Sequence, residues 1–131
     1  MRKLLIVAML VFSFGIWAQA ADYAVEAASE KQQELLEAMV NEGCKVKKLA
    51  VVKSQNHELA YYIGAEIKCN DEKKSFIGFW LMPGPKDDPE FALSVDDNAA
   101  RESWAPPPSA AMLKADATDK ECGVLSAHFK K

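Results

Sequence analysis

The chain has 131 residues, of which 50% are hydrophobic, and it carries 16 Lys or Arg against 19 Asp or Glu for a formal net charge of −3. A chain of this size can bury one hydrophobic core and predicts a single domain. Because the balance is mildly acidic and no basic stripe is present to neutralise phosphates, we expect no nucleic-acid partner.

The N-terminus has the three parts of a secretory signal peptide. Arg2 and Lys3 form a positive n-region, residues 4–17 an apolar h-region, and Ala18-Gln19-Ala20 a small-x-small cleavage site. The apolar stretch is shorter than the roughly 20 residues of a membrane span, so we expect cleavage after residue 20 and no membrane anchor afterwards. Residues 21–131 would then form one domain. Because Arg2 and Lys3 are lost with the leader, the net charge changes from −3 for the whole chain to −5 for this domain. A short leader of this kind is typical of bacteria and predicts a periplasmic or secreted protein.

The first element expected after the leader is a helix that begins after Ser29 and ends at Gly43. Ser29 with Gln32 three residues later forms a capping box, and Gly43 supplies a left-handed stop. Between them, apolar residues recur at the spacing that places one helix face against a sheet. These residues are Leu35, Leu36, Met39 and Val40.

Two strands are predicted next, at residues 44–53 and 57–69. The apolar phase of the first shifts near Lys47-Lys48, which indicates a β-bulge. The second alternates with a period of two, so that its odd-numbered positions, from Leu59 to Cys69, lie on one apolar face.

A third strand is predicted at residues 75–82, after a turn at residues 70–74, and a fourth where Phe91, Leu93 and Val95 alternate. Prolines between the two break the pattern. Together these elements predict an α+β domain in which the N-terminal helix packs on a four-stranded antiparallel meander in two layers.

The C-terminal third of the chain allows two alternatives. Asp96 or Asp97 can cap a short turn, and Trp104 precedes three prolines that require an extended polyproline path. Thr118 and Glu121 fit a second capping box, but a glycine two residues later weakens the helix, so either a terminal helix or a final strand is expected.

Three cysteines are present, at positions 44, 69 and 122. In an oxidising compartment one pair is expected to close and one thiol to remain. Of the three pairings, Cys44 with Cys69 is favoured because these residues lie at the outer ends of two adjacent antiparallel strands. Cys122 would then be buried and inert. The alternative, a reactive Cys122, needs an activating base, for which His128 is the only local candidate.

The sequence contains no recognisable catalytic or metal-binding motif. His57 and His128 stand apart from any CxxC, HExxH or carboxylate cluster, and Asp96-Asp97-Asn98 with Glu102 lacks the glycine and later ligands of an EF-hand. No GxSxG, GxGxxG or P-loop is found. We therefore expect no metal, no cofactor and no enzymatic activity.

The third strand is apolar on both faces, although the helix can cover only one. If the turn keeps the odd-numbered positions of strands two and three on one face, Ile77, Phe79 and Leu81 join the core and Gly64 lies opposite Trp80. Either the C-terminal segment covers the other face as a second layer, or that face is an exposed patch that binds a partner. The residues on that face would be Tyr62, Phe76, Trp80 and Met82.

These observations predict a small exported, non-catalytic binding or inhibitory module that contacts another envelope or extracellular protein. If the aromatic face is covered, Arg101 and Trp104 are the remaining anchors of the type that interfaces favour. A carrier of a small apolar ligand between helix and sheet, and an enzyme, are the alternatives. A helix followed by a meander resembles the architecture of cystatin-like inhibitors, although the glutamine-valine-glycine hairpin motif of that family is absent.

Overall fold

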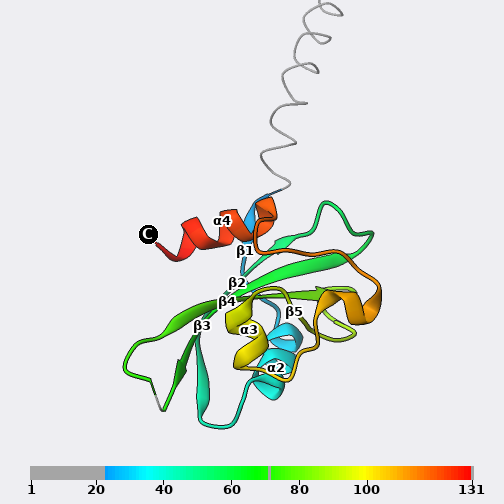
Figure 1. The fold of residues 1–131 in the computed structure, drawn as a ribbon. Helices are drawn as coiled ribbons and strands as arrows, with labels where there is room; N and C mark the ends of the chain where they lie inside the picture. Colours follow the sequence, from blue (N-terminus) through cyan, green and yellow to red (C-terminus); the bar gives the residue numbers. More distant parts are fainter. Residues whose placement is uncertain (1–22, 71, 131) are drawn as a thin grey trace, which may run out of the picture.

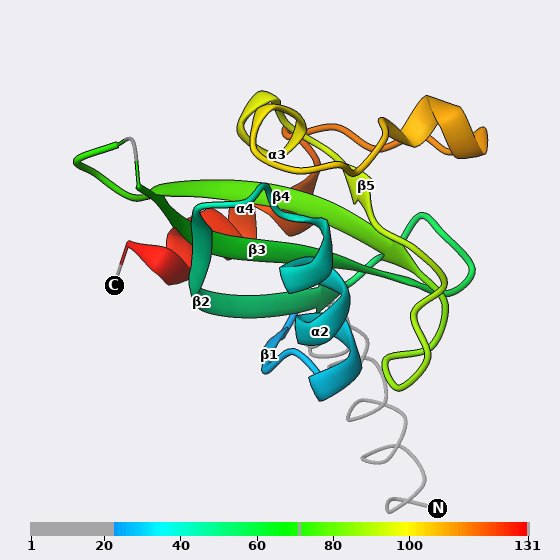
Figure 2. The same cartoon turned by 90° about the horizontal axis from the view of Figure 1, so that it is seen from below.

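The structure, a computed structural model, describes residues 23–70 and 72–130, so the predicted signal peptide and its cleavage site lie outside the described residues. An antiparallel sheet has the strand order β1-β2-β3-β4-β5. Helices α2 and α3 cover one face of this sheet and α4 covers the other (Figures 1 and 2). The predicted α+β class is therefore confirmed.

The bounds of the elements agree with most of the predicted segments. The strands are β1 Val25–Glu26, β2 Cys44–Lys53, β3 Ala60–Cys69, β4 Phe76–Pro83 and β5 Leu93–Ser94. The helices are α2 Glu30–Met39, α3 Asp97–Arg101 and α4 Lys120–Phe129, with a 3-10 turn η1 at Pro108–Ala111. The short edge strand β1 was not predicted, and it makes the sheet five-stranded.

Helix α2 begins at the predicted capping box, in which Ser29 and Gln32 exchange hydrogen bonds with each other's backbone N–H. The predicted end at Gly43 is wrong, because α2 stops at Met39. The carbonyl of Met39 accepts a hydrogen bond from the N–H of Trp104, and Val40 pairs with Ser103 in an isolated bridge. Contacts with a distant segment thus end the helix before the local glycine signal.

The first hairpin has the predicted form. Cys44 lies directly opposite Cys69, the two residues form a disulfide, and the β-bulge lies between Val46 and Lys48. A cross-link at this position fastens the open ends of β2 and β3. The predicted disulfide is confirmed.

The predicted facing of β4 is wrong. Trp80 lies opposite Ile63, and Gly64 lies opposite Phe79, so the even-numbered positions of β4 share a face with the odd-numbered positions of β3. Trp80 is completely buried on the α2 face, and its indole lies over Gly78, where an added Cβ would come within 2.7 Å of the ring. The bare backbone beneath the indole is therefore Gly78 of the same strand.

The other face of the sheet is covered by the C-terminal helix. Leu125 and Cys122 of α4 are buried against Tyr62, Leu81 and Leu93. Of the two alternatives for the end of the chain, the helix is observed, and it supplies the second layer.

Within residues 23–70 and 72–130, no helix combines the length and apolar character needed to cross a membrane.

Candidate functional site

The structure separates the four residues of the predicted aromatic patch. Trp80 and Met82 are fully buried under α2 and α3, Phe76 is half-buried at the same face, and Tyr62 is fully buried under α4. Since helices cover both faces, these residues do not form an exposed patch. They hold the two layers together.

Tyr62 also carries a buried polar contact. Its hydroxyl donates to the Asp119 carboxylate at 2.5 Å, and the same carboxylate oxygen accepts from the N–H of Asp116 at 3.0 Å. Burial, and next the hydrogen bond to Asp119, raise the pKa of Tyr62 far above its ordinary value. The phenol therefore stays protonated and fixes the start of α4 over β3.

The loop between β2 and β3 contains a Ser–His contact that resembles part of a catalytic arrangement. Ser54 Oγ lies 2.6 Å from His57 Nδ1, and His57 Nε2 lies 2.8 Å from the carbonyl oxygen of Lys114. Because a carbonyl can only accept, Nε2 donates to it, and in the neutral ring Nδ1 accepts from the serine hydroxyl. Ser54 is only 3% exposed. The contact ties the loop to the C-terminal segment and does not present a nucleophile.

Helix α4 contributes one buried carboxylate and one buried thiol, those of Glu121 and Cys122. Glu121 is 1% exposed and accepts from the N–H of Gln55 at 2.9 Å. Cys122 is buried and outside the disulfide, and burial, followed by the charges of Asp119 and Glu121, raises the pKa of its thiol to about 12. A neutral, buried thiol is a poor nucleophile.

The most exposed large apolar side chains lie between α3 and α4. Trp104 is 78% exposed and Met112 is 93% exposed. We call residues 101–112 the Trp104 segment. Met112 has a φ of 59°, a left-handed conformation that a residue with a side chain rarely adopts.

The Trp104 segment is held firmly by its backbone. Besides the bond from Trp104 to α2, the N–H of Ser94 donates to the carbonyl of Pro106 at 2.8 Å, and Ala105 and Pro108 are buried. Pro107 has φ −68° and ψ 159°, the polyproline II conformation that its sequence predicts. The segment thus presents its aromatic and apolar side chains on an ordered backbone.

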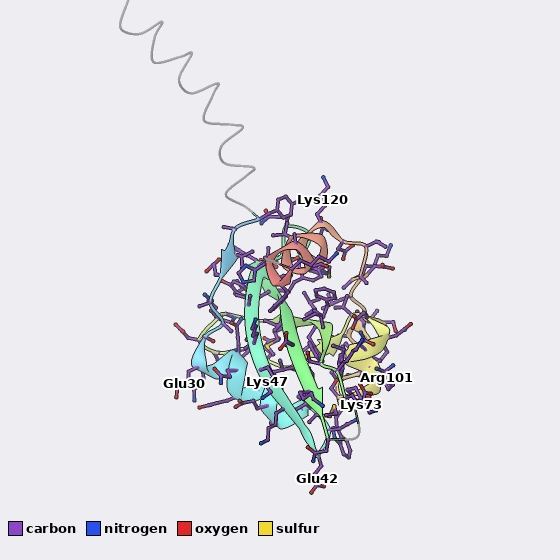
Figure 3. The ribbon with its side chains drawn as sticks, turned by 90° about the vertical axis from the view of Figure 1, so that its left-hand side faces the viewer. Glu30, Glu42, Lys47, Lys73, Arg101 and Lys120 are labelled. Carbon is purple, nitrogen blue, oxygen red and sulfur yellow. A yellow bond between two sulfur atoms is a disulfide. The ribbon has the colours of Figure 1, made fainter. Side chains whose placement is uncertain are left out.

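Arg101, the other predicted anchor, lies at the end of α3 (Figure 3). Its guanidinium is 5.7 Å from the centre of the Phe76 ring, and its Nε donates to Glu102 Oε1 at 2.9 Å. Arg101 is therefore exposed but already oriented at one end of the Trp104 segment. The sequence predicted Arg101 and Trp104 as interface residues but not Met112. The exposure of Met112 results from a turn that no local sequence motif predicts.

A hollow of about 420 Å³ lies over the disulfide at the opposite end of α2 from its capping box. Glu102 Oε2 approaches Cys44 Sγ to 3.6 Å and Cys69 Sγ to 3.5 Å. The spacing of these residues in the chain gave no signal of this cluster, because α3 carries Glu102 there from a segment 33 residues beyond Cys69. The lining residues are Asn41, Glu42, Gly43, Cys44, Cys69, Asn70, Glu72 and Glu102.

Comparisons with protein-family models, with characterised proteins and with solved structures found no match to this chain. The function proposed below is therefore argued from the residues and their geometry.

Proposed function

We propose that the protein is a small exported, non-catalytic binding module that acts by protein–protein contact through the Trp104 segment. The single observation that carries this proposal is the exposure of Trp104, 78%, on a backbone that is tied to α2 and to β5. A rigid tryptophan that the core does not use is the kind of residue that dominates the binding energy of interfaces.

The order of the segment supports binding by contact. Because Pro107 already has the polyproline II conformation and Trp104 is hydrogen-bonded to Met39, little backbone entropy would be lost when a partner docks. Arg101 at one end and Met112 at the other extend the surface with a planar cation and a flexible apolar side chain.

We place the partner in the bacterial envelope or outside the cell. The disulfide between Cys44 and Cys69 is of the kind that persists in oxidising compartments. The signal peptide predicted from residues 1–20 would bring the protein there. These two features together support a periplasmic or secreted location.

The polar groups of the molecule favour a non-catalytic role. Ser54, Tyr62 and Glu121 are each buried and hydrogen-bonded to another part of the fold. A carrier role would need room between α2 and the sheet, where Leu36 and Trp80 pack with no exposed surface.

The test is a binding measurement with an identified partner. A partner captured from the envelope fraction is purified, and its affinity for the wild-type protein and for Trp104→Ala is measured by calorimetry. We expect a loss of at least about 30-fold in affinity, which corresponds to a hot-spot residue.

Leu59→Ala is the matched control, because Leu59 is an exposed apolar residue, 41% exposed, in the loop before β3. It should change the affinity by no more than about twofold. Equal affinities of Trp104→Ala and Leu59→Ala for the partner would contradict the proposal.

A further inference from the structure

We propose that reduction of the Cys44–Cys69 disulfide converts the hollow above it into a binding site for Zn²⁺, with Cys44, Cys69 and Glu102 as ligands. The two sulfur atoms and one carboxylate oxygen of Glu102 all lie within 4.8 Å of one another. They belong to β2, β3 and the residue that follows α3. This inference is independent of the binding role of the Trp104 segment.

The distances from the carboxylate to the sulfurs already suit a tetrahedral zinc ion. With Zn–S bonds of about 2.3 Å and a Zn–O bond of about 2.0 Å, each sulfur lies about 3.5 Å from the oxygen, and the two sulfurs lie about 3.8 Å apart. Glu102 Oε2 is 3.5 Å from Cys69 Sγ and 3.6 Å from Cys44 Sγ. Only the two sulfurs need to separate, and they do so when the bond between them is broken.

Glu102 is held in the orientation that a metal ligand needs. Its Oε1 accepts from Arg101 Nε at 2.9 Å, which leaves Oε2 directed at the sulfurs. In the described part of the chain, no N–H or O–H group donates to Oε2, so this oxygen keeps its capacity to bind a cation.

The donor set and its surroundings favour zinc. Two thiolates and a carboxylate match the ligands of this borderline-soft ion, and the fourth tetrahedral position would face the hollow. The hollow is also lined by Glu42 and Glu72, whose carboxylates attract a cation, and it gives a reductant access to the disulfide.

The conversion is balanced by one dithiol reductant. A thiolate of the reductant attacks one sulfur of the Cys44–Cys69 bond, and its second thiol then releases that sulfur, so that the reductant becomes a disulfide and the protein gains two thiols. Zn²⁺ displaces one proton from each thiol, and two protons leave for each ion bound. The metal then joins β2 to β3 where the covalent bond did before.

Cys122 is the remaining thiol, and the fold keeps it away from this site. It belongs to α4 and is buried in the cluster on the opposite face of the sheet from the disulfide. A Cys122→Ser background therefore removes its contribution to thiol signals without altering the ligands.

The test is a titration of this Cys122→Ser protein with Co²⁺ and Zn²⁺ without oxygen, after reduction by dithiothreitol and its removal. We expect one Co²⁺ per chain with a thiolate-to-cobalt charge-transfer band, and a higher melting temperature of the reduced protein with Zn²⁺. The oxidised protein should show neither effect. If reduction alone unfolds the chain, Zn²⁺ should restore a cooperative melting transition.

Two carboxylate variants assign the third ligand. Glu102→Gln should weaken Zn²⁺ binding by at least about tenfold, whereas Glu42→Gln, on the same hollow, should change it by no more than about twofold. The proposal is overturned if the reduced protein shows no charge-transfer band and no gain in melting temperature. It is also overturned if Glu102→Gln and Glu42→Gln bind Zn²⁺ equally well.

Discussion

The tryptophans Trp80 and Trp104 lie in opposite environments, one in the core and one on the surface. Trp80 has no exposed surface and donates from its indole to Ser103 Oγ at 3.0 Å, whereas Trp104 is 78% exposed. Ser103 in turn donates to the carbonyl of Ala99, so Trp80 links β4 to the end of α3. The buried tryptophan therefore stabilises the layer from which the exposed one projects.

Substitution should separate these two roles. Trp80→Ala leaves a large cavity on the α2 face and should lower the free energy of unfolding by about 3–5 kcal/mol. Trp104→Ala removes a side chain that is 78% exposed and should change the free energy of unfolding by no more than about 0.5 kcal/mol. Urea denaturation of both variants measures the difference. A large loss of stability in Trp104→Ala would show that its side chain supports the fold.

Some of these residue-level features could be predicted from the sequence, and the facing of β4 could not. The pairing of Cys44 with Cys69 follows from two adjacent strands joined in one hairpin, and it is confirmed. The facing of Trp80 depends on how many residues the turn after β3 uses, and Ile67 pairs with Phe76 instead of an odd-numbered residue. A change of one residue in a turn exchanges the two faces of a strand.

At the level of elements, the sequence predicted those features whose signal lies in residues that are close together in the chain. The capping box of α2 and the bulge of β2 are confirmed, since each depends on neighbours in the chain. The end of α2 and the two-residue strand β1 were missed, because Trp104 and Val52 supply their hydrogen-bonding or strand partners from far along the sequence. Such long-range partners leave no periodic pattern to detect.

The carboxylate of Asp96 ties the start of helix α3 to β4. Asp96 Oδ1 accepts from the N–H of Ala99 at 2.9 Å, as the helix cap, and from the N–H of Phe79 at 3.2 Å. Burial raises the pKa of Asp96, although these two backbone hydrogen bonds oppose the shift. A raised pKa means that the folded state favours the protonated carboxyl, so the contribution of Asp96 to stability falls as the pH rises above its ordinary value of 3.8.

Two substitutions at Asp96 should therefore change the free energy of unfolding in opposite directions. Asp96→Asn keeps an oxygen that can accept both hydrogen bonds and removes the charge, so its stability relative to wild type should increase between about pH 3 and pH 7. Asp96→Ala loses both bonds and should cost about 1–2 kcal/mol. Urea denaturation across this pH range measures both. A decrease in the relative stability of Asp96→Asn with rising pH would contradict the burial of the carboxylate as the dominant cause.

For the whole molecule, the last element of the chain completes the fold. Helix α4 closes the face of the sheet that α2 and α3 leave open. The C-terminal segment is held in place because Tyr62 and His57 donate hydrogen bonds to it and the carboxylate of Glu121 accepts one from the N–H of Gln55. The sequence could predict that a second layer was needed, since β4 is apolar on both faces. It left the form of that layer open because Gly123 opposes a helix locally, while the contacts of Leu125 and Cys122 with the sheet favour one.

The seating of α4 on the sheet can be tested with two glycines that receive the same added methyl group. A Cβ at Gly64 of β3 would lie 2.8 Å from Phe129 Cε2 and 3.3 Å from Leu125 Cβ, so the Phe129 ring and the part of α4 at Leu125 would both have to shift. Gly64→Ala should therefore lower the free energy of unfolding by about 1–3 kcal/mol. It should also speed the alkylation of Cys122, which α4 keeps buried.

Gly123 of α4 provides the matched comparison, because an added Cβ there meets nothing within 4 Å. Gly123→Ala should raise the free energy of unfolding by up to about 1 kcal/mol, since alanine restricts the unfolded chain and favours the helix. Denaturant unfolding and the rate of Cys122 alkylation are measured for both variants. Stability gains in both would place α4 away from Gly64, whereas opposite signs follow if α4 rests on the bare backbone of β3 and closes the second layer.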